Sequence, residues 1–96
     1  MILQKYILDK KHNLIPVDFM TWAVFFENVK NRQIALDKIG KITISTIFLG
    51  IDHNFGNGKP LLFETMIFPG GEQWRWHTWN EAIKGHKKIY KWKKEE

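Results

Sequence analysis

Apolar residues near the N-terminus recur at the spacing of an amphipathic helix. The stripe occupies positions i, i+3, i+4, i+7 and i+10, filled by Phe19, Trp22, Ala23, Phe26 and Val29. Asp18 stands just before it, and Asp is a favoured N-cap residue. The pattern therefore predicts a first helix that begins after Asp18 and turns one apolar face inward.

A second helix is expected near the C-terminus. Thr78 and Glu81 match the capping box, with Thr as N-cap and Glu at the third helical position, so the helix is expected from about Trp79 to Trp92. At about 100° per residue it has an apolar arc and an opposite basic arc. The apolar arc holds Trp79, Ala82, Ile83, His86, Ile89 and Tyr90, and the basic arc holds Lys84, Lys87, Lys88, Lys91 and Lys94.

Between these helices the pattern changes to short runs rich in β-branched and aromatic residues. They are separated by polar or glycine-rich segments, and Gly40-Lys41 suits a Gly-first, two-residue hairpin turn. A weak hairpin is expected before the first helix, with Asp9–Asn13 as its turn. The expected strands are residues 3–8, 14–15, 32–39, 42–51, 61–68 and 74–77.

This order of elements predicts an α+β fold. We expect an antiparallel meander of three to five strands with two helices packed on it, both on one face. The 96 residues are enough for a single domain with one modest core, and residues 84–96 form its basic helical tail.

Composition narrows the class of protein. The chain has no Cys, which excludes disulfide scaffolds and Cys-based zinc sites and fits a cytoplasmic location. No apolar run reaches the roughly 18 residues that span a bilayer, and the N-terminus lacks the pattern of a signal peptide, so no membrane association is expected. Net charge is +5, and residues 84–96 alone hold six Lys and two Glu. Because the basicity is confined to the tail, nucleic acid is a weaker expectation than a solvated helix face.

Ionisable residues stand out against the apolar strands. Asp52 and His53 follow one apolar run, and Glu64 lies inside the next, where packing alone gives no reason for a carboxylate. A meander would bring these residues near Arg75 and His77, and His86 would face the sheet from the last helix. We expect several of them to meet between sheet and helix, and the candidate ligand-binding residues are Asp52, His53, Phe55, Glu64, Arg75, His77 and His86.

Three interpretations of this set stay open. The first is a buried polar network in which His86 bonds Asp52 or Glu64, while Glu64 pairs with Arg75. The second is a metal or acid–base site, but no His-x-x-x-His or Ser-His-Asp spacing supports it, so no catalytic residue or metal ligand is assigned. The third is a pocket for a nucleotide-like ligand, with flat walls from Phe55, Trp74, Trp76 and Trp79.

Three motifs resemble a family of small phage- and prophage-encoded proteins. They are Phe-Leu-Gly-Ile-Asp-His-x-Phe from Phe48, Leu-Phe-Glu-Thr-Met from Leu62, and Thr-Trp-x-Glu-Ala-x-x-Gly-His from Thr78. The resemblance covers about residues 19–86. It transfers no catalytic role, but it implies an accessory phage protein of the kind that often counters host defences.

Together the residues and the resemblance predict a non-enzymatic binding protein that acts in counter-defence without a cofactor. Its expected partner is a nucleotide-like immune signal or a host defence protein. The alternatives are an inhibitor of a nuclease or CRISPR-type effector by protein–protein contact, and a small metal-dependent hydrolase. A domain this small often needs a second copy to complete a pocket, so a homo-oligomer also stays open.

Overall fold

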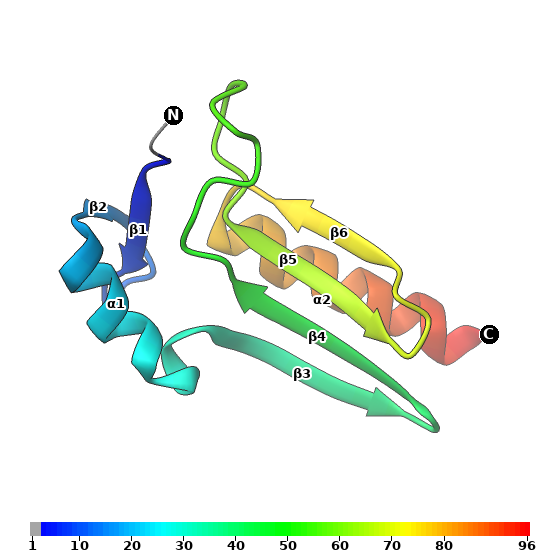
Figure 1. The fold of residues 1–96 in the computed structure, drawn as a ribbon. Coiled ribbons are helices and arrows are strands. Elements are labelled where there is room, and N and C mark those ends of the chain that lie inside the picture. The colour runs from blue at the N-terminus through cyan, green and yellow to red at the C-terminus, as the bar shows by residue number, and fades with distance from the viewer. Residues whose placement is uncertain (1–2) are drawn as a thin grey trace.

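The computed structural model describes residues 3–96 and contains two antiparallel sheets and two α-helices (Figure 1). The first two strands pair as a hairpin, and the other four form a meander in sequence order. The α+β class and the meander are confirmed. The elements are β1 (Lys5–Leu8), β2 (Leu14–Val17), α1 (Phe19–Glu27), the 3₁₀ turn η1 (Val29–Asn31), β3 (Gln33–Ile39), β4 (Ile42–Phe48), β5 (Phe63–Phe68), β6 (Gln73–Trp76) and α2 (Trp79–Glu95).

Strand alternation gives the four-stranded sheet one covered and one open face. Ile44 and Phe48 of β4 and Phe63 and Ile67 of β5 are buried, and they belong to the same apolar clusters as residues of α2. Their neighbours along each strand point the other way. At the β3–β4 turn Gly40 has a φ of +56°, which suits the expected Gly-first hairpin.

The helix α2 covers one face of this sheet and contacts all four of its strands (Figure 1). Its N-cap is Thr78, whose hydroxyl accepts a hydrogen bond from the Glu81 N–H at 3.1 Å, as the capping box predicts. Its buried residues are Ala82, Gly85, His86 and Ile89. Gly85 is needed there because a Cβ would overlap the Trp76 ring.

The helix α1 is arranged differently. Asp18 is its N-cap and accepts from the Thr21 N–H at 2.8 Å, as expected, but the helix ends at Glu27 and Val29 falls in η1. It packs against β1 and η1, and Phe25 and Phe26 reach the sheet only at the Phe48 end. The two helices therefore do not lie side by side on one face; α2 alone spans it (Figure 1).

The hairpin joins the larger sheet just beyond β4. The Tyr6 N–H donates to the Gly50 carbonyl at 2.8 Å, and Lys5 forms an isolated bridge with Ile51. Gly50 has a φ of +73°, and a Cβ there would overlap Phe26. This turn ends β4 at Phe48, three residues before the end expected from the sequence.

Within residues 3–96, no helix is both long and apolar enough to cross a membrane.

Candidate functional site

The seven candidate residues lie in three separate places rather than in one cluster. Asp52 organises the loop between β4 and β5. Its carboxylate accepts hydrogen bonds from the N–H groups of Asn54, Gly56 and Leu61, at 2.7 to 3.1 Å. Burial by itself would raise the pKa of Asp52, but the three N–H donors outweigh it and lower the pKa below its ordinary value. Asp52 is therefore ionised, and both of its carboxylate oxygens hold the loop together by accepting hydrogen bonds from the backbone of that loop.

The side chains of His53, in this loop, and of His77, between β6 and α2, both contact backbone carbonyl groups of the same loop. The Nδ1 atom of His53 lies 2.8 Å from the Ile51 carbonyl oxygen, and that of His77 lies 2.9 Å from the Pro60 carbonyl oxygen. Phe55 projects from the same loop and is 59% exposed. These contacts place the three candidates at one end of the sheet, with the histidines fixing the loop.

Glu64 and Arg75 lie on the open face of the sheet, away from α2. They are direct partners on β5 and β6, and Arg75 Nε–H donates to Glu64 Oε2 at 3.0 Å. The expectation that they meet His86 between sheet and helix is wrong, because Phe63, Thr65 and Ile67 occupy the helix side of β5. The expected pairing of Glu64 with Arg75 is confirmed, although Glu64 is only 8% exposed.

His86 faces the sheet as expected, but its partners differ from those expected. Its Nε2 lies 2.7 Å from Asp37 Oδ2, and its Nδ1 lies 2.6 Å from Thr46 Oγ1. Thr46 Oγ1 is 2.6 Å from Thr65 Oγ1, which accepts from Trp76 Nε1–H at 3.0 Å. The partners are thus neither Asp52, which is in the loop, nor Glu64, which is on the other face. The sequence places Asp37, Thr46 and Thr65 inside apolar strands, but it does not show that their side chains lie on the same face of the sheet.

In this chain of hydrogen bonds a carboxylate, an imidazole and a hydroxyl follow one another. Asp37, His86 and Thr46 thereby match the order of groups in a nucleophilic triad. Thr46 has no exposed surface, however, and His86 is 3% exposed, so a substrate does not reach the hydroxyl. The network satisfies buried polar groups and fixes α2 on the sheet.

No group of three or more His, Asp or Glu side chains in the described part of the chain is placed to hold a metal ion.

A groove between β6 and α2 combines aromatic and basic side chains. It has a volume of about 580 Å³, its aromatic walls are Trp74 and Trp76, and Lys84 and Lys88 stand along α2. Trp92, one further helical turn along, meets Trp74 edge to face with ring centroids 6.2 Å apart. The sequence marked the Trp and Lys residues separately. It did not show that they line one groove, because that follows from how α2 crosses β6.

No family model, curated protein or solved structure matches this chain. The resemblance to small phage proteins therefore stays a prediction, and a functional assignment rests on the geometry of the sites.

Proposed function

We propose that this chain is a non-enzymatic binding protein whose groove between β6 and α2 takes a nucleotide-like anion. The observation that carries the proposal is the lining of that groove, where Trp74 and Trp76 stand beside Lys84 and Lys88. Flat apolar walls suit a planar ring, and ammonium groups suit phosphate. The volume of about 580 Å³ lies within the range of small-molecule sites.

Each group has a definite role in this proposal. Stacking on a Trp ring contributes about 1–3 kcal/mol per base. The ammonium groups of Lys84 and Lys88 are one helical turn apart on the same side of α2, so both can contact one phosphate group. Glu81 lies at the same groove and supplies an acceptor for an amino group on the ring.

The biological setting of the proposal comes from the resemblance alone. Small phage-encoded proteins of this kind often counter host defences, and sequestering a signalling nucleotide is one way to do so. A counter-defence protein of that type needs a binding groove and no catalytic centre. The seven residues expected from the sequence are not part of this groove.

Isothermal titration against cyclic and ADP-ribose-type nucleotides tests the proposal. We expect binding to at least one of them, and a roughly tenfold loss of affinity in the Lys84→Ala/Lys88→Ala variant, since each partly exposed charge contact contributes up to about 1 kcal/mol. The Lys87→Ala/Lys91→Ala variant is the matched control, with the same charge loss on the same helix but outside the groove. Equal losses in both variants, or no binding by the folded protein, would refute the groove as the site.

Trp74 gives a second measurement on the same groove. Its fluorescence is expected to be quenched on binding, and Trp74→Leu is expected to weaken binding by removing the stacking surface. Since Trp74 also packs against the apolar cluster of Ile44, Ile67 and Ile89, circular dichroism must show that the variant is folded.

A protein partner is the second candidate function, favoured by the charge of α2. Its five arc lysines, Lys84, Lys87, Lys88, Lys91 and Lys94, are all exposed. A surface of this kind is complementary to an acidic patch on a nuclease or other effector. The two double-lysine variants separate the candidates, because protein docking over the whole arc would be weakened by both and nucleotide binding by the first alone.

A further inference from the structure

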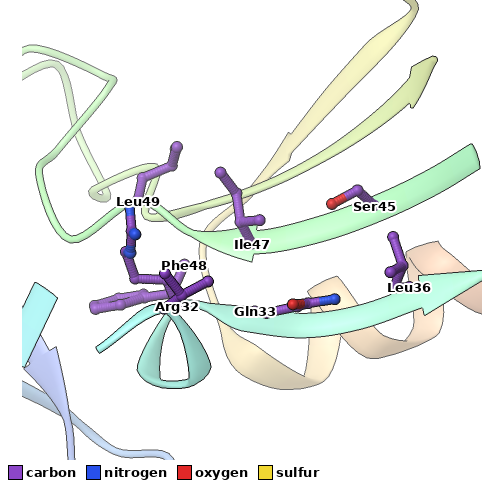
Figure 2. A pocket seen from close by; sticks show the side chains of 8 residues that line it. Arg32, Gln33, Leu36, Ser45, Ile47, Phe48 and Leu49 are labelled. Atoms are coloured by element: carbon purple, nitrogen blue, oxygen red, sulfur yellow. The ribbon is translucent and has the colours of Figure 1, made fainter. Parts of the chain in front are cut away.

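The open face of the sheet holds a second cavity, on the other side from α2. It has a volume of about 420 Å³ and lies between η1 and the adjoining parts of β3 and β4 (Figure 2). Val29, Leu36, Ile47 and Leu49 supply its apolar surface, and Arg32 is its only charged lining residue. Figure 2 shows the Arg32 side chain extending toward Leu49, with Ile47 and Leu36 projecting to the same side of the sheet.

Arg32 differs from the other arginine of the described chain because its side chain has no ion-pair partner. Arg75 is paired with Glu64, whereas Arg32 forms no ion pair within residues 3–96 and its Nε is buried without a hydrogen-bond partner. Its guanidinium carbon lies 5.6 Å from the centroid of the Phe26 ring, which supports the group from one side. A buried donor without an acceptor is costly, by about 1–3 kcal/mol, unless something else accepts from it.

The surroundings of Arg32 define what that acceptor would be. A guanidinium presents a planar fork that matches a carboxylate. Next to it, Val29 and Leu36 are 57% and 48% exposed, so the cavity offers apolar surface that a ligand can cover. We propose that this cavity binds a small carboxylate carried on an apolar chain, with the carboxylate on Arg32 and the chain along Val29, Leu36 and Ile47.

This inference is independent of the proposed function, because the two cavities share no lining residue and lie on opposite faces of the sheet. It also gives Arg32 a different role from a structural one. A structural arginine would be bonded within the fold, and its loss would lower stability. Arg32 makes no hydrogen bond through Nε that its removal could break.

Nuclear magnetic resonance with octanoate as the probe tests the ligand class on the unmodified protein. We expect octanoate to shift the Arg32 Nε–H signal and the methyl signals of Leu36 and Ile47 with a common saturation curve. Octan-1-ol and octylammonium have the same apolar chain without the carboxylate and are expected to bind at least tenfold more weakly. Equal shifts from all three compounds would show that the carboxylate is not recognised and would overturn the proposal.

The variant Arg32→Met tests whether Arg32 binds the carboxylate, since Met keeps an apolar side chain and removes the guanidinium group. We expect octanoate affinity to fall at least tenfold with only a small change in the urea midpoint, from loss of the contact with the Phe26 ring, and Arg32→Lys to bind with an intermediate affinity. The matched control is Lys38→Met, which removes a charge from the same face of β3 outside the cavity and is expected to bind as the parent does. Unchanged octanoate binding in Arg32→Met, or an equal loss in Lys38→Met, would contradict the proposal.

The Lys84→Ala/Lys88→Ala variant is expected to retain octanoate binding, so failure of one site is distinguishable from failure of the other.

Discussion

The N-terminal unit (Lys5–Glu27) and the meander with α2 (Gln33–Glu95) each contain an apolar helix stripe, and the two stripes are buried to very different extents. No residue of α1 is buried, and Phe19, Met20 and Val24 are all more than half exposed. In α2, by contrast, four residues are buried, and every fully buried side chain of the described chain lies between Ile44 and Ala82. The difference teaches that an apolar stripe becomes a core only where a second layer covers it.

The N-terminal unit is held to the rest of the molecule at a few points. One is the backbone contact of Tyr6 with Gly50, and another is the ring of His12, which stacks on Trp79 with centroids 3.6 Å apart. The third is an apolar contact at the Phe48 end of the sheet, where partly buried side chains of the hairpin and α1 pack against the core: Tyr6, Leu8, Leu14, Phe25 and Phe26. The stability of the whole should therefore depend much more on the meander than on the hairpin and α1.

Truncating the centre of the meander is expected to have the largest effect. Phe63→Ala removes a fully buried aromatic ring and should lower the free energy of unfolding by about 3–5 kcal/mol. Met20→Ala, on the exposed side of α1, should change it by less than about 0.5 kcal/mol. Urea denaturation measures both. Similar losses for the two variants would show that the comparison between the regions is wrong.

Breaking the buried hydrogen-bond chain is expected to have the next largest effect. Thr46→Val keeps the shape of the side chain but leaves His86 Nδ1 without its partner, so it should cost about 1–3 kcal/mol. The control is Thr43→Val, on the open face of the same strand, which should be nearly neutral. A neutral Thr46→Val would mean that the chain contributes no net stability.

Loss of the ring stack that joins the two regions should lower the free energy of unfolding by a smaller amount. His12→Ala removes the ring that lies on Trp79 and should cost about 0.5–1.5 kcal/mol. We expect amide exchange to accelerate in β1 and β2 and to stay unchanged in β4 and β5. Uniform acceleration across all strands would instead show that the two regions unfold as a single unit.

The effect at Asp52 is expected to appear in the pH dependence of stability. Its pKa is lowered in the folded protein, so its contribution is present above its unfolded value of 3.8 and is lost as the pH falls through the folded value. Asp52→Asn keeps one acceptor oxygen and removes the titration. Urea midpoints should therefore fall less steeply below about pH 4 in the variant than in the parent, and parallel curves would contradict the role of this carboxylate.

Local chemistry made much of the fold predictable. Asp18 and Thr78 cap their helices as expected, because an N-cap depends on residues within one turn, and Gly40 marks its hairpin for the same reason. Strand ends differ from those expected by one to three residues, and the largest difference, at the end of β4, comes from the contact of β1 with Gly50.

The sites were less predictable because they depend on which face of the sheet α2 covers. The alternation of β5 fixes that Glu64 and Thr65 point to opposite sides, but only the packing of α2 decides which side is buried. The same packing pairs His86 with Asp37 and brings Lys88 beside Trp74. Arg32 was visible only as the start of a strand, since its lack of a partner is a property of the folded surroundings.

The meander also has a consequence for the time course of folding. Neighbouring strands of the meander are consecutive in sequence, so their backbone contacts are more local than the contacts of α2 with β3 and should form earlier. The contact between Asp37 and His86 joins residues 49 positions apart, so it can close only after α2 has docked. We expect Thr46→Val to speed unfolding while leaving the refolding rate nearly unchanged, as stopped-flow measurements would show. The buried network would then slow unfolding and so set the lifetime of the native state.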